Sequence, residues 1–276
     1  MLGFSACGAI KKPADYGLTD PVNTPSITDI PTLPPEWERS GWKLIWQEEF
    51  EGSEINLKNW TFDIGGDGWG NNELEFYKRG PENVRLINGL LVIEARAESF
   101  GGRDFTSARL KTQGLQSWTY GRFESRIKIP AGQGVWPAFW MLGEDIAQIG
   151  WPDCGEIDIL ENIGKEPNRV HASAHSKDYF ASHSLTGSME IDTPLSEDFH
   201  IYAIEWDENE IRWFLDEEEY FHISKSEVPG GWAFNKPFFI ILNLAIGGNW
   251  PGAPDETTIF PKQMLVDYVR VYQRSD

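Results

Sequence analysis

Three carboxylates stand close together in an apolar segment, at Glu156, Asp158 and Glu161. The aliphatic residues between them are typical of a buried β-strand. A strand that is apolar on both faces has no structural need for acids, so carboxylates held there against desolvation indicate chemistry. Two carboxyl groups held near each other cannot both ionise cheaply. One would keep its proton and act as an acid, while the other would act as a nucleophile.

Strand geometry decides which of the three acids face the same way. Residues two apart share a face, so Glu156 and Asp158 project together, whereas a regular strand sends Glu161 to the opposite side. A β-bulge within Ile159 and Leu160 would return Glu161 to the first face, and bulges are common beside active sites. The two glutamate Cα atoms would then lie roughly 13 Å apart. Side chains leaning inward would bring the carboxyl groups to about 5 Å, the separation found in retaining glycosidases.

The same acids allow a second interpretation. Three oxygen donors would suit calcium, and an exposed strand face also carries acids. The apolar flanks disfavour the flexible loop that a calcium site normally uses.

Composition narrows the class of ligand. The chain has 276 residues, of which 40% are hydrophobic, and this suits one large domain with its own core. A formal charge of -19, from 43 acidic and 24 basic residues, disfavours nucleic acid, anionic lipid and sulfated polysaccharide as partners. The 13 tryptophans offer flat faces for neutral sugars, although many could simply be core aromatics.

The beginning of the chain is unlike the rest. Small residues lead to Cys7, as at the end of a bacterial lipoprotein signal, but a basic region and a long apolar stretch are missing. Either the true start lies upstream or this is a plain tail. Residues 8 to about 40 are rich in proline and read as an extended spacer. We therefore expect a signal remnant or disordered tail plus linker over 1–40, a catalytic domain over 41–276, and a secreted or bacterial cell-surface (outer-membrane) lipoprotein.

From Trp42 onward the sequence predicts an all-β fold. Short apolar or alternating runs are separated by Gly, Pro, Asn and Asp. Only 143–150 and 224–227 look able to form a helical turn, so βαβ crossovers are absent and the sheets should be antiparallel. No apolar stretch reaches 18 residues, so no transmembrane segment is expected. We predict two packed sheets, with strands at 90–95, 123–129, 199–206, 210–216, 238–245 and 264–272.

The segment 155–161 resembles the catalytic signature of glycoside hydrolase family 16 in its bulged form. The resemblance covers nearly all of residues 42–273, and its flanks are similar to laminarinase-type endo-β-1,3-glucanases. It implies a concanavalin A-like β-jelly-roll sandwich with an open substrate cleft on the concave face. It also implies Glu156 as nucleophile, Glu161 as acid/base and Asp158 as their helper, acting with retention. Supporting segments are 69–75, 120–124, 134–142 and 243–252.

The resemblance implies a set of substrate-binding residues. They are Asn72, Arg109, Trp136, Trp140, Trp151, His175 and Trp250. The tryptophans would stack on glucose rings, the polar residues would reach sugar hydroxyls, and His175 would lie near the acid/base. Alternatives remain: Trp136 packing a turn, Arg109 neutralising the acids and so lowering the pKa of the nucleophile, His175 as a hydrogen-bonded structural residue, and Trp250 covering the edge of the core.

No cofactor is expected for catalysis, but the resemblance implies one possible structural calcium. Its ligands would be the carbonyls of Glu49 and Gly89 and the side chain of Asp267. An acid within a buried-looking strand favours pairing with an ion or with an arginine. Cys154, next to the signature, should pack under the site, because the sequence shows no base to activate it.

The sequence thus predicts retaining hydrolysis of β-1,3 bonds in a neutral, laminarin-like β-glucan by a monomer. The rival activity is cleavage of mixed-linkage β-1,3-1,4-glucan. Enzymes specialised for that substrate usually have the unbulged signature, which makes Leu160 the discriminating residue. A glucan-binding lectin on the same sandwich would keep the tryptophans and lose a glutamate, whereas this chain has both.

Overall fold

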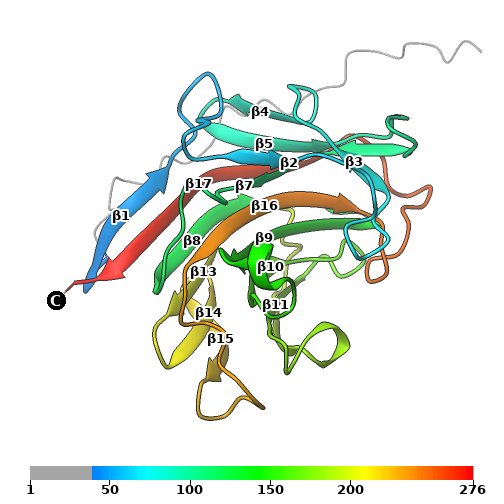
Figure 1. The fold of residues 1–276 in the computed structure, drawn as a ribbon. Coiled ribbons are helices and arrows are strands. Elements are labelled where there is room, and N and C mark those ends of the chain that lie inside the picture. Colours follow the sequence, from blue (N-terminus) through cyan, green and yellow to red (C-terminus); the bar gives the residue numbers. More distant parts are fainter. Residues whose placement is uncertain (1–38, 276) are drawn as a thin grey trace, which may run out of the picture. The chain divides into compact units, whose positions relative to one another are not determined.

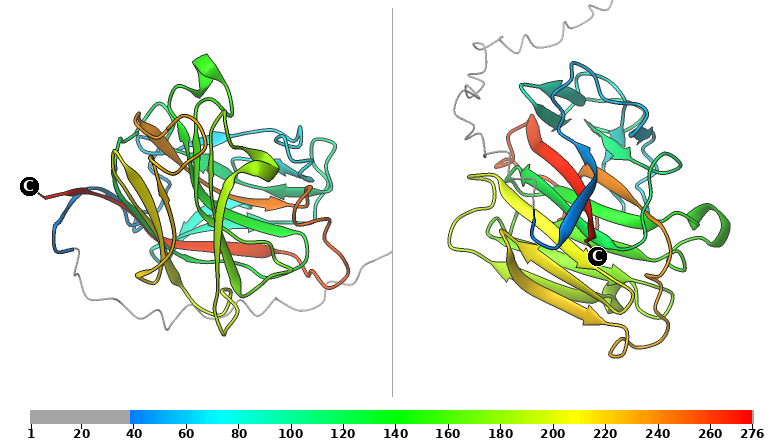
Figure 2. Two further views of the ribbon diagram at one scale, coloured as in Figure 1. Left: turned by 90° about the horizontal axis from the view of Figure 1, so that it is seen from below. Right: turned by 90° about the vertical axis from the view of Figure 1, so that its left-hand side faces the viewer.

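The structure, a computed structural model, describes residues 39–275. The predicted spacer and Cys7 therefore lie outside the described residues, except for positions 39 and 40. Within this range two large antiparallel sheets form a sandwich, as the alternating strand patterns predicted. Figure 1 shows the two sheets as curved layers, and the strands of each sheet lie alongside one another again in the views of Figure 2.

One sheet of the sandwich, sheet A, contains eight strands. Seven follow one another in space and β1 (Trp42–Glu48) pairs with β17, as Figure 1 shows. The order of the seven is β15 (Glu218–Ser224), β14 (Glu210–Leu215), β13 (His200–Trp206), β8 (Gly121–Lys128), β17 (Lys262–Arg274), β5 (Leu90–Ala95) and β4 (Val84–Ile87).

The other sheet, sheet B, contains seven strands and includes the carboxylate segment. Its order is β12 (Leu185–Glu190), β11 (Arg169–His175), β10 (Glu156–Glu161), β9 (Val135–Gly143), β16 (Phe238–Ile246), β7 (Arg109–Lys111) and β2 (Thr61–Asp63). The strand β10 therefore has a partner on each side, and its backbone is fixed by two ladders.

The core lies between the two sheets. Strand β10 contributes Ile157, Ile159 and Leu160 to it, all fully buried, and β16 is buried along its whole length. Such continuous apolar strands bury both faces, whereas β12 alternates between half-buried and exposed positions. Burial of this apolar area is the main force that holds the sheets together.

The minor elements are short. A predicted helical turn is confirmed as α1 (Ile146–Ile149), while the segment at Ser224 forms a turn closed by a hydrogen bond from Glu227 N. A 3-10 turn, η1, spans Ala181–His183. The parallel pair of β3 (Glu75–Tyr77) and β6 (Phe105–Ser107) was not predicted. In residues 39–275, no helix has the length and apolar character that crossing a membrane requires.

Candidate active site

The predicted bulge is present in β10. Pairing with β9 shifts register between Asp158 and Leu160, and pairing with β11 shifts between Asp158 and Glu161. Ile159 and Leu160 are neighbours in sequence, yet both are fully buried in the core. One extra residue therefore enters the core side of the strand at this point.

The register against β11 places all three acids on one face. Glu156 lies opposite His175, Asp158 opposite Ser173, and Glu161 opposite His171. These β11 positions are two apart and so share a face, and cross-strand partners project together. The bulge thus returns Glu161 to the face that carries Glu156 and Asp158, as the strand geometry predicted.

The opposite sheet secures the bulge. The buried indole Nε1 of Trp213, on β14, donates a hydrogen bond of 2.8 Å to the main-chain carbonyl of Asp158. The strand is entered through Gly155, whose φ of +74° is in the left-handed region that favours glycine. A Cβ there would lie 2.9 Å from the ring of Phe238. The carboxylate face is therefore fixed by contacts across the core as well as within its own sheet.

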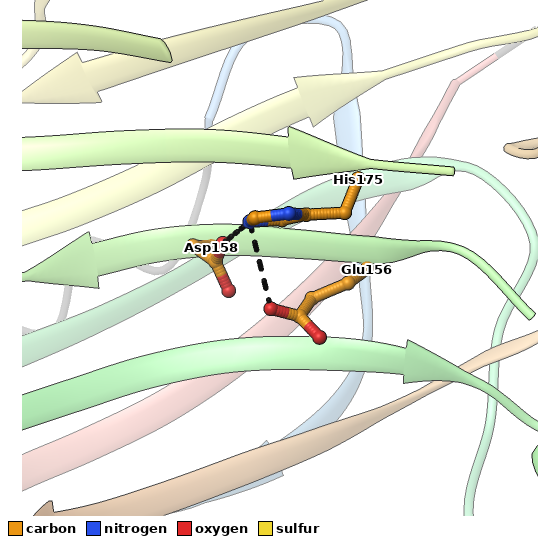
Figure 3. Close-up of side chains that lie close together, drawn as sticks. All are labelled: Glu156, Asp158 and His175. Carbon is orange, nitrogen blue, oxygen red and sulfur yellow. Dashed lines mark hydrogen bonds and ion pairs between the residues drawn. The ribbon is translucent and has the colours of Figure 1, made fainter. Parts of the chain in front are cut away.

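Glu156, Asp158 and His175 form the centre of the site. The imidazole Nε2 of His175 lies 3.1 Å from Asp158 Oδ2 and 3.6 Å from Glu156 Oε1, as Figure 3 shows. The carboxylate of Glu156 also accepts a hydrogen bond of 2.8 Å from the indole Nε1 of Trp151. His175 therefore connects Asp158 with Glu156, and Trp151 provides a second contact that orients the glutamate.

Glu161 has a matching indole partner. Its Oε1 accepts a hydrogen bond of 3.1 Å from Nε1 of Trp136 on β9. Among the described residues no lysine or arginine forms an ion pair with Glu156, Asp158 or Glu161. The like charges of the site thus face neutral donors and one histidine, and ionisation of all three is opposed.

Burial changes the proton affinity of these groups. It raises the pKa of Glu156 to about 8, with the charge of Asp158 adding to the effect, while His175 and the Trp151 N–H oppose it. Burial also raises the pKa of Asp158 to about 8, opposed by a hydrogen bond with Glu156. The pKa of Glu161 is raised well above its ordinary value by burial and then by the charge of Asp158. The cluster consequently holds protons that free carboxyls would release, which is the condition for a general acid.

The family match agrees with this geometry. Residues 71–270 match the model of glycosyl hydrolases family 16. The chain belongs to that family. It is 45% identical to a β-glucanase of Rhodothermus marinus over 247 residues, which cover 84% of this chain and 85% of the relative.

Solved structures extend the comparison of this family 16 hydrolase. The laminarinase catalytic domain of Thermotoga maritima is 45% identical, with a TM-score of 0.82 over 85% of this chain and 99% of that one. A non-specific endo-β-1,3(4)-glucanase of family 16 is 37% identical, with a TM-score of 0.79 over 86% and 93% of the two chains. The sandwich predicted from the sequence is therefore the jelly roll of the family.

His175 was expected near the acid/base, and its charge lowers the pKa of Glu161 as well as that of Glu156. In the β10–β11 ladder His175 lies opposite Glu156, while His171 lies opposite Glu161. His171 Nε2 contacts Glu166 Oε2 at 3.1 Å, and burial lowers its pKa. The register of β11 was the missing information, since alternation alone puts both histidines on the correct face without saying which acid each meets.

Trp140 and Arg109 pack together beside the acids. The Arg109 guanidinium lies 4.7 Å from the centre of the Trp140 ring and 5.0 Å from that of Trp69. Its Nε also lies 3.0 Å from Asp63 Oδ2. Arg109 lowers the pKa of Glu156, but less than His175 and the Trp151 N–H do. Arg109 thus mainly contacts aromatic rings and Asp63. Its alternative role, neutralising the acids, is only weakly present.

The remaining predicted cleft residues lie on loops. The side chain of Asn72 donates a hydrogen bond of 2.9 Å to Asn249 Oδ1, next to Trp250. The Trp250 ring stands edge-on to Trp136 at 5.6 Å and to His171 at 4.9 Å. Trp250 remains 36% exposed, so its ring packs against site residues and is still accessible to a ligand.

Sequence reasoning missed three contacts of the site. Trp69 was noted only as part of a segment, yet it covers Arg109 and lies 5.4 Å from Tyr77. Phe180 is 41% exposed and stands edge-on to Trp151 at 5.7 Å. Asn243 accepts a hydrogen bond from the Trp140 indole. The excess of tryptophan in the sequence could have pointed to Trp69. No periodic pattern marked Phe180 or Asn243.

Of the predicted calcium ligands, the side chain of Asp267 is engaged with an arginine. Asp267 Oδ2 accepts a hydrogen bond of 2.8 Å from Arg126. The side chain of Glu49, whose carbonyl was the predicted ligand, forms a two-point pair with Arg270 at 2.8 and 3.0 Å. Asp267 is therefore paired with an arginine, which was the alternative to an ion. Its carboxylate charge is already compensated, so little charge is left to bind a cation. Calcium at these residues and Gly89 stays a prediction without support from the contacts.

A second group of metal-ligating side chains lies at the centre of the candidate site. One ligand atom each from Glu156, Asp158 and His175 lies within 4.8 Å of the others. The same atoms already contact one another, and the chemistry proposed below needs no metal. Cys154 is fully buried, and burial raises its thiol pKa to about 11, in keeping with the predicted packing role.

Proposed function

We propose that this family 16 hydrolase cleaves internal β-1,3-glucosidic bonds of neutral, laminarin-like glucans with retention of anomeric configuration. The observation that carries the proposal is the bulge, which puts Glu156 and Glu161 on one face of β10. Laminarinase in the name of the Thermotoga maritima relative supports the substrate class. Two carboxylates on one strand face supply the nucleophile and the acid that double displacement requires.

In the first step, Glu156 attacks the anomeric carbon and Glu161 gives its proton to the leaving glycosidic oxygen. The C–O bond of the substrate breaks as the ester bond to Glu156 forms, so charge is conserved. In the second step, Glu161 removes a proton from water, and the water oxygen displaces Glu156. The raised pKa of Glu161 supports its acid role, because a carboxyl must hold a proton before it can donate one.

Asp158 and His175 act on the nucleophile. His175 contacts both carboxylates, and the charge of Asp158 raises the pKa of Glu156. The imidazole and the indole N–H of Trp151 favour the ionised form of Glu156 against the effect of burial. The nucleophile is thus kept oriented, and its charge is stabilised by two neighbours.

The substrate would lie across the carboxylate face. Trp136 and Trp151 each direct an N–H to a catalytic glutamate, and their rings are placed to meet sugar rings beside them. The net charge of -19 favours a neutral polymer over a sulfated one. We propose that the protein acts on this polymer as a monomer, secreted or displayed at the cell surface.

Mixed-linkage β-1,3-1,4-glucan is the second candidate substrate. The 37% identity to a non-specific endo-β-1,3(4)-glucanase favours some activity on it. The bulge at Ile159 and Leu160 favours laminarin as the better substrate, because enzymes specialised for mixed linkages usually have the unbulged signature.

The proposal is tested by incubating the purified protein with laminarin, lichenan and agarose and measuring reducing ends and product lengths. We expect the highest kcat/KM on laminarin, lower activity on lichenan, none on agarose, and short oligosaccharides from the earliest times. Absence of laminarin cleavage, or release of glucose alone, would overturn the proposed endo-activity.

A further inference from the structure

A buried polar cluster lies behind Trp140, and the proposed reaction does not use it. It consists of Glu73, Glu75, Tyr77 and Asn243, whose exposed fractions are 4%, 0%, 0% and 6%. Polar groups buried to this degree are costly unless they are hydrogen-bonded. Their contacts therefore show what the cluster holds in place.

The cluster is connected to the Trp140 indole by three hydrogen bonds. Nε1 of Trp140 donates to Asn243 Oδ1 at 2.7 Å. The amide nitrogen of Asn243 donates to the Tyr77 hydroxyl at 3.1 Å. The hydroxyl of Tyr77 donates to Glu73 Oε2 at 3.1 Å. The chain of contacts runs from a ring on the carboxylate sheet to a glutamate beside β3.

The chemistry of the indole fixes the direction of every bond in this chain. Tryptophan Nε1–H can only donate, so Asn243 must present its oxygen to Trp140 and its NH2 group to Tyr77. The Tyr77 oxygen then accepts, and its single proton is left for Glu73. Glu73 must therefore be an acceptor at that oxygen, the role of a carboxylate.

Glu75 completes the cluster as a proton donor. Glu73 and Glu75 are close enough for the charge of Glu73 to raise the pKa of Glu75, and two neighbouring buried carboxyls are favourable only when one is protonated. Oε2 of Glu75 accepts a hydrogen bond of 2.7 Å from the main-chain N–H of Ile246, while its Oε1 is buried without a partner. A proton on Oε1 directed at Glu73 satisfies both groups. Burial and the charge of Glu73 raise the pKa of Glu75, in agreement with this placement.

The surroundings favour this arrangement over a charged pair. Burial raises the pKa of Glu73, and hydrogen bonds together with the charge of Arg109 on β7 oppose that rise. The charge of Arg109 also reaches Tyr77. The segment also docks closely against the end of β16. Leu74 N donates a hydrogen bond of 2.7 Å to Ile246 O, and a Cβ on Gly247 would lie 2.5 Å from the Leu74 side chain. The glutamates are therefore held rigidly beside the strand that carries Asn243.

We propose that Glu75, Glu73, Tyr77 and Asn243 form a directional hydrogen-bond relay that fixes the Trp140 ring as a glucan-binding platform. These are positioning residues, since they act through Trp140 and Arg109 rather than on the sugar. Trp140 lies opposite Asp158 in the ladder, so its ring is placed beside the reacting groups. The contact with glucan rests on the proposed function, whereas the proton on Glu75 does not.

The first test removes one hydroxyl from the relay. Tyr77→Phe leaves the NH2 group of Asn243 and Oε2 of Glu73 without their common partner. It is expected to lower kcat/KM for laminarin roughly three- to tenfold, mainly through KM. Tyr202→Phe is the matched control, because Tyr202 is equally buried on β13 and its hydroxyl has no partner. Equal kinetics for the two variants, or a loss in kcat with unchanged KM, would overturn the relay.

The second test reverses the roles of the two acids. Glu75→Gln keeps a neutral side chain that can donate to Glu73. Both oxygens of Glu73 accept hydrogen bonds, one from Tyr77 and one from Asn71, so the NH2 group of Glu73→Gln must face a donor at one of the two positions. We expect Glu73→Gln to lose roughly tenfold in kcat/KM and Glu75→Gln to lose clearly less. The opposite order would show that Glu73 carries the proton and would overturn the assigned direction.

The last test is independent of glucan hydrolysis. A carboxyl that stays protonated in the fold makes stability fall as pH rises above about 4.5, because the unfolded chain releases that proton. Glu75→Gln should therefore raise Tm relative to wild type at pH 7, and the difference should shrink towards pH 4. An equal Tm difference at both pH values would overturn the proton on Glu75. Absence of laminarin cleavage together with the predicted Tm pattern would sink the proposed function and not the proton placement.

Discussion

Strands β8 and β10 carry charge in opposite ways. Strand β8 has Arg122, Glu124 and Arg126 at alternating positions, and β10 has three acids on one face. Arg122 is 2% exposed and contacts Glu124 at 2.9 Å, and also Glu205 and Glu217. Arg126 contacts Asp267 at 2.8 Å. Each of these three charges thus has a partner of opposite sign.

On β10 the charges have the same sign, and their partners are indoles and a histidine. Alternation of polar and apolar residues predicts the strand in both cases, but only the pattern of charge pairing separates the two roles. Paired buried charges stabilise structure, while unpaired like charges raise pKa values and keep protons in place. The difference predicts that changes on β8 affect mainly stability and changes on β10 mainly activity.

The largest effect is expected from Glu156→Ser. Loss of the nucleophile should lower kcat on laminarin roughly 10⁴- to 10⁶-fold without unfolding the protein. Glu190→Ser is the control, since Glu190 lies on β12 with its side chain 62% exposed and paired with Arg169. Steady-state kinetics and circular dichroism would check both. Undiminished cleavage by Glu156→Ser would contradict the role of β10.

On β8, Arg122→Met should act on stability. Removing one partner of a buried ion pair costs about 3–5 kcal/mol, and the lower value is expected because Arg39 still contacts Glu124 at 2.7 Å. Denaturant unfolding measures the loss, and kcat per folded molecule should stay near the wild-type value. A large loss of kcat with unchanged stability would remove the distinction between the two strands.

Trp213→Phe connects the two sheets and should affect both properties. The main-chain carbonyl of Asp158 loses its buried donor, which costs about 1–3 kcal/mol of unfolding free energy. Because the bulge is then less firmly held, kcat should fall as well. Urea unfolding and kinetics test this together, with Trp232→Phe as control, because the Trp232 indole N–H has no partner. A stability loss with full kcat would show that the bulge does not depend on Trp213.

The smallest effect is the expected change in thermal stability of Glu161→Gln. Burial raises the pKa of Glu161, so the folded state keeps a proton that the unfolded chain releases above about pH 4.5. Stability of the wild type therefore falls as pH rises, and the variant removes that penalty while losing activity. Tm should rise by a few degrees at pH 8, at about 2–4 °C per kcal/mol for a domain of this size, and match wild type near pH 4. A lower Tm at pH 8 would contradict the raised pKa.

Local patterns were sufficient to predict much of the site. The alternation along 156–161 gave the strand, and the position of Glu161 required the bulge that the structure contains. The excess of tryptophan predicted aromatic contacts around the acids. These features depend on residues that are close together in the chain, so a single sequence is enough to predict them.

Contacts between distant segments could not be predicted. His175 meets Glu156 because of the β10–β11 register, and Trp213 reaches Asp158 from the opposite sheet. The parallel pair β3–β6 brings only three residues of each strand together, too few to leave a periodic pattern. Glu73 and Glu75 belong to segment 69–75, which supported the family resemblance, but only tertiary packing buries them. Long-range geometry, rather than local propensity, decides these cases.

The most direct test of the central claim is the anomeric configuration of the first product. Proton NMR of fresh laminarin digests, recorded before mutarotation, identifies the anomer released by the wild-type protein. If Glu156 and Glu161 act by double displacement, the β-anomer appears first and the α-anomer grows in later. Initial release of the α-anomer would contradict the account, because it would require direct attack by water and no covalent intermediate on Glu156.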